Sequence, residues 1–193
     1  KDTLSIFKGG LKFIAKGNSL DDLAGKLTVS NVSYQNSRDN YFFDDFQIES
    51  TFDPENVRTI TINSPDIIQG KVTGKYEIKQ VRKIVENALG SLYANYSPNK
   101  LKPGQFLDFD FTIYSKIIEI FLPQVTVGEN TVLKGRIDAD KGDFKLDFSS
   151  PNVVAYNNTF ENIRVDVDNK NPLYNAYIEL DSIKTKGYKI SDF

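Results

Sequence analysis

The 193-residue chain contains no cysteine, histidine, methionine or tryptophan. Without cysteine there can be no disulfide and no thiolate chemistry, and without histidine the commonest general base and metal ligand is missing. These absences exclude many classes of enzyme. Because no initiator methionine is present and residues 188–193 look like a strand cut short, we expect this sequence to be a fragment of a longer polypeptide.

Strong charge of one sign and long apolar runs are missing as well. The 24 basic and 26 acidic residues give a formal net charge of −2, so the field is too weak to gather nucleic acid or an anionic membrane surface. No apolar run approaches the roughly 18 residues that a membrane-spanning helix requires, and no signal peptide is recognisable. We therefore predict no nucleic-acid partner and treat residues 1–193 as one segment.

Only one long stretch has apolar residues at helical spacing. This stretch, from Tyr76 to Tyr96, predicts an amphipathic helix that Pro98 cannot continue. Gly90 in its interior costs about 1 kcal/mol relative to alanine, which indicates either a slim side where another backbone approaches or a tolerated glycine near the helix end. A second, short helix is predicted near residues 115–121. The residues expected to face the core from the long helix are Ile78, Val81, Val85, Ala88, Leu89, Leu92 and Tyr96.

The other segments alternate apolar and polar residues with period two, as half-buried strands do. The cleanest example runs from Phe106 to Ile113, and residues 67–76 predict a strand pair or one bent strand. Residues 31–34 and 43–48 resemble residues 152–156 and 160–165, which indicates degenerate β repeats. The predicted fold is mainly β: an elongated, curled, trough-like sheet with the long helix against or inside its apolar concave face.

Paired carboxylates are the pattern closest to catalytic chemistry. Such pairs can act as acid and base, but Asp108 with Asp110, and the pairs at 138/140 and 166/168, alternate with apolar residues and are better explained as a solvated sheet face. Residues 138–143 lack the ligand order of a calcium-binding EF-hand loop, and residues 70–75 are too short for a phosphate-binding Walker loop. We predict no catalytic residue, metal site or cofactor.

Several blocks of the sequence resemble a known family. They are Gly-Asn-Ser-Leu-Asp-Asp-Leu-Ala-Gly from Gly17, Asn-Val-Ser-Tyr at 31–34, and residues 101–105 leading to 121–123 and 131–135. Together they look like the periplasmic part of TamB, in the form found in the Bacteroidetes group of the AsmA-like superfamily. The resemblance spans most of the chain, although no single block is a diagnostic motif.

The resemblance implies a non-enzymatic protein of the bacterial cell envelope. TamB-like proteins are anchored in the inner membrane of diderm bacteria and cross the periplasm as a U-shaped sheet with an apolar inside, a β-taco. They are linked to phospholipid transport toward the outer membrane. With an outer-membrane partner, TamA, they form the translocation and assembly module linked to outer-membrane protein biogenesis and protein secretion. The long helix departs from a pure β trough, so it either fills the groove or leaves it open.

If this resemblance holds, one apolar face of the sheet would contact phospholipid acyl chains. One alternative is a scaffold that pairs its edge strands with outer-membrane protein precursors. Another is an adhesin-like or carbohydrate-binding β-sandwich, which two closed sheets would identify. The residues predicted to line the groove are Leu27, Val29, Ile60, Ile62, Phe109, Phe111, Ile113, Ile137, Leu146, Phe148, Ile163 and Val165.

Overall fold

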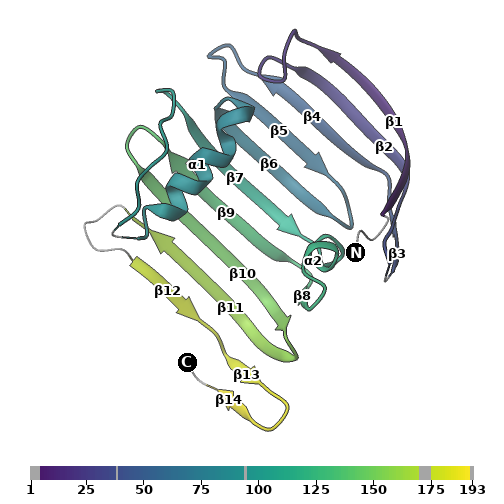
Figure 1. The fold of residues 1–193 in the computed structure, drawn as a ribbon, viewed down its shortest axis with the longest axis vertical. Coiled ribbons are helices and arrows are strands. Elements are labelled where there is room, and N and C mark those ends of the chain that lie inside the picture. Colours follow the sequence, from purple (N-terminus) through teal and green to yellow (C-terminus); the bar gives the residue numbers. More distant parts are fainter. Residues whose placement is uncertain (1–4, 38, 94, 170–174, 192–193) are drawn as a thin grey trace.

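The computed structural model describes residues 5–37, 39–93, 95–169 and 175–191. In this part of the chain, fourteen strands form one curved, open antiparallel sheet accompanied by two helices (Figure 1). The helices are α1 (Ile78–Gly90) and α2 (Ser115–Phe121). The strands are β1 (Ile6–Lys16), β2 (Ala24–Gln35), β3 (Asn40–Phe43), β4 (Phe46–Phe52), β5 (Arg58–Asn63), β6 (Ile68–Lys75), β7 (Phe106–Ile113), β8 (Val125–Val127), β9 (Thr131–Asp138), β10 (Asp143–Ala155), β11 (Asn158–Asp168), β12 (Asn175–Glu179), β13 (Ser182–Lys184) and β14 (Lys189–Ser191).

This architecture confirms the prediction of a mainly β, curled sheet with one longer and one short helix. The β-sandwich alternative is wrong, because every described strand belongs to the same sheet. β14 takes up part of the predicted final strand at 188–193, of which residues 192 and 193 lie outside the described residues. The degenerate repeat stays a prediction.

The sheet follows the chain from one edge to the other. Its main path is β1-β2-β4-β5-β6-β7-β9-β10-β11, with β12 beside one half of β11 and the β13-β14 hairpin beside the other half. The short strands β3 and β8 pair with the ends of β2 and β10. Most described strands pair with the next one along the chain, so the sheet grows largely by successive hairpins, with β3, β8 and β12 as side branches.

Two phenylalanine rings lie over glycines on neighbouring strands. Phe111 is opposite Gly70, where an added Cβ would lie 2.8 Å from the ring, and Phe109 is opposite Gly135, where it would lie 2.4 Å from the ring. An aromatic ring that covers a glycine restores the packing that the missing side chain would provide. The predicted stretch at 67–76 contains one strand, β6, over Ile68–Lys75, so the alternative of a strand pair is wrong.

Helix α1 is shorter than the predicted stretch from Tyr76 to Tyr96. It begins after Glu77, and the first helical N–H group, of Ile78, donates a 2.7 Å hydrogen bond to Asp21 Oδ1. It ends at Gly90, where an added Cβ would lie 2.4 Å from the Tyr96 ring. The glycine thus stands at the helix end, and what approaches it is an aromatic ring rather than a backbone. α2 forms at the predicted position.

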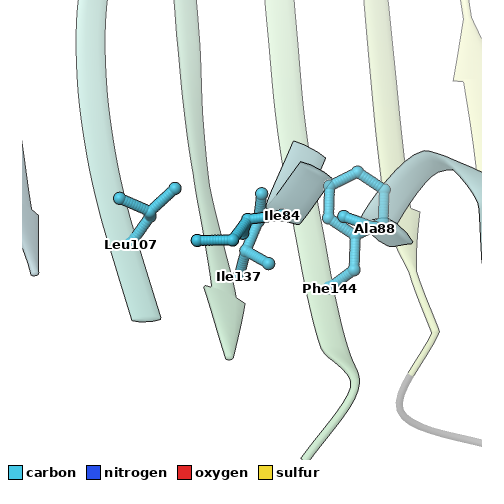
Figure 2. Packing of buried hydrophobic residues seen from close by; sticks show 5 residues of the cluster. All are labelled: Ile84, Ala88, Leu107, Ile137 and Phe144. Carbon is cyan, nitrogen blue, oxygen red and sulfur yellow. The ribbon is translucent and has the colours of Figure 1, made fainter. Parts of the chain in front are cut away.

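The hydrophobic core lies between α1 and the sheet (Figure 2). Its buried members are Ile84 and Ala88 from the helix and Leu107, Ile137 and Phe144 from β7, β9 and β10. The cluster occupies one end of these strands, since α1 crosses them there (Figure 1). The main hydrophobic cluster of the described residues therefore lies under the helix, and Val29 and Val32 of β2 are buried apart from it.

The predicted core-facing side of α1 is partly wrong. Val85 is 38% exposed and Leu89 is 47% exposed, whereas Ile84, which that set leaves out, is fully buried. Ile84 and Ala88 are four residues apart and share a face. Val85 and Leu89 lie about 100° further around the helix, as each residue advances by that angle, so they fall on a flank instead of the contact face.

Candidate functional site

One row of apolar residues crosses the sheet from edge to edge. Residues directly opposite each other on neighbouring strands place their side chains on the same face, so the register can be followed from β1 to β12. We call this line of residues the apolar row. Gly70 is its single member without a side chain. Its members are Phe13, Leu27, Ile48, Ile62, Gly70, Phe111, Leu133, Phe148, Val165 and Ile178.

A second row runs beside the first on the same face. It contains smaller residues, with one hydroxyl, and we call it the flanking row. Its members are Ala15, Gly25, Ser50, Ile60, Val72, Phe109, Gly135, Leu146, Val167 and Ala176. The two rows together make a continuous apolar band across ten strands.

All twelve residues predicted to line a groove lie on this face. Eight belong to one of the two rows, and each of the other four lies two residues along its strand from a row member. Val29 and Ile137 are buried, and the other ten are partly exposed. Their contact with lipid stays a prediction. The prediction missed Phe13, Ile48, Val72, Leu133, Val167 and Ile178, which follow the same alternation and could have been found by it.

The apolar row is open along its whole length. None of its members is fully buried, and its two end residues, Phe13 and Ile178, are 58% and 62% exposed. By contrast, Leu107 under α1 is only 4% exposed. A large exposed apolar surface on a protein marks a site for another molecule, so this face is the candidate functional site.

Helix α1 lies over one end of the face, where part of the flanking row packs against the core beneath it. One flank of the helix is anchored to the loop before β7: the Asn87 amide donates to the Asn99 carbonyl at 2.9 Å, and Gln80 Oε1 accepts from the Lys102 N–H at 3.0 Å. The opposite flank carries the exposed Val85 and Leu89. α1 thus covers one end of the face, while the apolar row further along the strands stays partly exposed.

A buried arginine closes the same end of the face. Arg58 is 5% exposed and shares the side of the sheet that carries Ile60. Its Nε donates to Ser50 Oγ at 2.9 Å, and its two terminal nitrogens donate to the carbonyls of Leu20 and Leu23 at 2.9 and 3.1 Å. These bonds hold the loop between β1 and β2 over the end of the face, and Asp21 of that loop binds the start of α1.

Three ionisable groups at this end, Tyr76, Glu77 and Lys102, have shifted pKa values. The Tyr76 hydroxyl is buried and has no hydrogen-bond partner among the described residues, and this burial raises its pKa. The Lys102 ammonium group binds the Glu77 carboxylate and, with Gln80, lowers the pKa of that carboxyl group. Neither arrangement provides a proton donor or acceptor within the trough, since both lie beside the start of α1.

The opposite face of the sheet is charged. The cross-strand pairs Lys134–Asp110 and Arg136–Asp108 have nitrogen-to-oxygen distances of 3.1 and 3.4 Å. These carboxylates therefore serve a solvated, ion-paired sheet face, as their spacing predicted, and both pairs are largely exposed. Within the described ranges, no group of three or more histidine, cysteine, aspartate or glutamate residues could hold a metal ion.

No helix in the described part of the chain is long and apolar enough to cross a membrane. Comparison of the chain with protein-family models, curated proteins and solved structures gave no match.

Proposed function

We propose that this chain is a non-enzymatic segment of a TamB-like cell-envelope protein and that its apolar face shields phospholipid acyl chains in the periplasm. The observation that carries the proposal is the half-exposed apolar row, which runs without a charged residue across ten strands. The sequence blocks that resemble TamB support the same function. In this proposal the full-length protein is anchored in the inner membrane and meets an outer-membrane TamA-like partner.

The dimensions of the row suit a chain-like apolar ligand. Nine steps between neighbouring strands, at about 4.8 Å each, give the row a length of about 43 Å along the sheet. One acyl chain is about 15 Å long, half of the roughly 30 Å hydrocarbon core of a bilayer. An acyl chain lying along the row would therefore cover three to four strands, and the row is long enough for successive chains.

The chemistry of the face favours movement over tight binding. Fully burying one methylene group is worth about 0.8 kcal/mol, and an open trough buries only one side of each chain. The hydrophobic effect is also non-directional, and the apolar row offers no polar group that would fix a headgroup at one position. A lipid could therefore move along the row without breaking specific bonds, which suits transport.

Phospholipid uptake by delipidated protein tests this proposal. Native mass spectrometry should detect phospholipid bound to the wild-type chain. Phe111→Lys, in the middle of the apolar row, should weaken phospholipid uptake by roughly tenfold, because it places a charge against the acyl chain. Thr112→Lys is the matched control, since it adds the same charge one residue along β7 on the opposite face. It should leave uptake unchanged.

Circular dichroism and thermal melting establish that both variants remain folded. If the folded wild-type chain takes up no phospholipid, the acyl-chain proposal is wrong for this segment. Equal losses in Phe111→Lys and Thr112→Lys would also contradict it, because the effect would then follow the added charge and not the face.

A further inference from the structure

A small cavity lies where α1 and the loop between β1 and β2 cover the end of the sheet face. Its volume of about 220 Å³ equals that of about seven liquid waters and is below the roughly 300–1,000 Å³ of pockets for drug-sized ligands. The loop between β1 and β2, the facing ends of β4, β5 and β6, the start of α1 and the loop before β7 contribute to its lining. The cavity therefore has room for a small ion or for one polar group of a larger molecule.

Arg58 lines this cavity and is a buried cation whose partners carry no charge. It is 5% exposed, and its hydrogen-bond partners among the described residues are the Ser50 hydroxyl and the carbonyls of Leu20 and Leu23. The guanidinium group has five N–H donors, so two of them remain after these three bonds. Phe52 lies over the guanidinium group, with its ring centre 5.4 Å from Cζ. Because a buried charge is costly unless it is paired, the two remaining donors indicate a place for an anion.

A second donor without a partner lines the same cavity. The Tyr76 hydroxyl is buried and has no hydrogen-bond partner among the described residues. Burial keeps the pKa of this phenol above its ordinary value, and the positive charge of Arg58 opposes that shift. The phenol is therefore neutral at pH 7 and can donate a hydrogen bond to an anion that Arg58 also binds.

The two carboxylates in the lining already have positive partners. Asp21 accepts the Ile78 N–H at the positive end of the α1 dipole, and Glu77 pairs with the Lys102 ammonium group. The charge of Arg58 is left without such a partner. Three basic and two acidic residues line the cavity, which leaves one positive charge in excess; they are Arg58, Lys75, Lys102, Asp21 and Glu77.

From these features we propose that the cavity binds a phosphate group through the remaining N–H groups of Arg58 and the hydroxyl of Tyr76. A guanidinium group matches the spacing of phosphate oxygens. The two residues come from different strands, Arg58 from β5 and Tyr76 from the end of β6. A phosphate group suits them better than a planar carboxylate, because its oxygens surround a tetrahedral centre and can be reached from two sides.

The phosphate is the headgroup of a bound phospholipid, a step that rests on the proposed acyl-chain function. Arg58 donates to Ser50 of the flanking row, and Ile62 of the apolar row is four residues further along β5, or about 14 Å. That distance is within the length of one acyl chain, about 15 Å. Because the cavity lies beside the apolar row, it would hold one lipid while the row itself stays free of polar groups.

Nitrogen NMR of the arginine Nε groups tests the site on delipidated protein in phosphate-free buffer. The chain has five arginines, and through-space contacts with the Phe52 ring identify the signal of Arg58. Titration with inorganic phosphate should shift this signal to saturation, while the signals of the exposed Arg82 and Arg136 should change little. Sodium acetate should bind more weakly than phosphate.

A pair of hydroxyl deletions tests the second donor. Tyr76→Phe should raise the apparent dissociation constant for inorganic phosphate roughly tenfold, because it removes one hydrogen bond to a charged group. Tyr93→Phe is the matched control: it removes the same hydroxyl from a residue that is 73% exposed and lies outside the cavity. It should leave phosphate binding unchanged. Thermal melting shows whether both variants are folded.

A lipid arm distinguishes a headgroup from free phosphate. Short-chain phosphatidylglycerol should shift the Arg58 signal at a lower concentration than inorganic phosphate does, since its acyl chains add contacts with the apolar row. Diacylglycerol with the same chains has no phosphate and should leave the Arg58 signal in place. If inorganic phosphate shifts Arg58 and phosphatidylglycerol does not, the cavity is a site for free phosphate and the headgroup assignment is wrong.

Other results would overturn the phosphate site itself. They are an Arg58 signal that phosphate does not move, acetate binding as tight as that of phosphate, and equal effects of Tyr76→Phe and Tyr93→Phe. Each of these can occur while the chain still takes up phospholipid, in which case the acyl-chain proposal stands without this site. Conversely, a chain that binds phosphate at Arg58 and takes up no phospholipid would retain the site and refute the acyl-chain proposal.

Discussion

The same face of the same strands has two different environments in this molecule. Under α1, Leu107 in β7 is 4% exposed and Phe144 in β10 is 3% exposed. Four residues further along these strands, Phe111 and Phe148 point to the same side of the sheet but are only half-buried. The two sets are alike in residue type and strand position, and they differ in whether a helix lies above them.

This difference separates stability from function. Alternation along the strands makes one face apolar, and α1 with the loop between β1 and β2 converts one end of that face into a core. Most of the remaining face keeps its contact with solvent, which costs free energy that a bound apolar molecule would recover. We therefore expect substitutions under α1 to affect folding and substitutions in the open part of the apolar row to affect binding.

The largest expected effect comes from truncating the same residue type in the two environments. Phe144→Ala should lower the free energy of unfolding by about 3–5 kcal/mol, as in other fully packed cores. Phe148→Ala, on the same strand and face, should lower it by only about 1 kcal/mol, since its half-exposed ring loses less on truncation. Urea unfolding followed by circular dichroism measures both values.

For phospholipid uptake, we expect the two variants to have the opposite order of effects. Phe148→Ala should reduce phospholipid uptake, while Phe144→Ala, studied where it remains folded, should leave uptake close to that of the wild-type chain. Equal losses of stability in the two variants would show that the open face is packed as tightly as the covered one, and the comparison would fail.

Much of the open face could be predicted from sequence because its signal is local. Period-two alternation assigns each residue of a strand to a face without knowledge of its neighbours, which is why all twelve predicted residues lie on one side. Alternation could also have assigned Phe13 and Ile178 to the apolar side of their strands, but joining them into one row needed the register between strands. That register depends on hairpin geometry and on bulges, such as the one in β1 between Lys8 and Gly10.

The end of the sheet face that α1 and the loop between β1 and β2 cover was harder to predict, because its contacts are between segments far apart in the sequence. The contact face of α1 depends on the loop that anchors Gln80 and Asn87, and this is why Ile84 was missed and Val85 misplaced. The burial of Arg58 depends on carbonyls 38 and 35 residues away. The start of α1 is bound by Asp21, 57 residues earlier in the chain. None of these partners leaves a periodic trace in the sequence.

A smaller effect on stability is expected at the start of α1, where the loop between β1 and β2 binds the helix. Asp21→Ala removes the carboxylate that accepts the Ile78 N–H at the start of α1, and it also removes a negative charge at the positive end of the helix dipole. Loss of such a cap should lower the free energy of unfolding by about 1 kcal/mol. Amide hydrogen exchange should then rise in α1 more than in β4 and β5.

Asp22→Ala is the neighbouring comparison, because Asp22 binds the N–H groups of Asn18 and Ser19 within its own loop and not the helix. It should affect exchange in the loop and leave α1 protected. If both variants loosen α1 equally, the loop as a whole holds the helix, and the direct bond from Ile78 to Asp21 is not the attachment.

The smallest effect is expected at Tyr76, on the border of the covered end. Its buried hydroxyl has no partner among the described residues, so Tyr76→Phe should change the free energy of unfolding at neutral pH by less than about 1 kcal/mol, in the stabilising direction if at all.

Burial raises the pKa of Tyr76 in the folded chain. The contribution of the neutral phenol is therefore complete below the ordinary tyrosine pKa of about 10 and is lost as the pH rises through the folded value. The wild-type chain should consequently lose stability relative to Tyr76→Phe only above about pH 10, measured as the difference between their urea unfolding free energies. Because the other tyrosines and the lysines titrate in both proteins, that difference isolates Tyr76. A constant difference across this range would mean that Tyr76 is as solvated as the residues of the open face, and the border of the covered end would then lie further under α1.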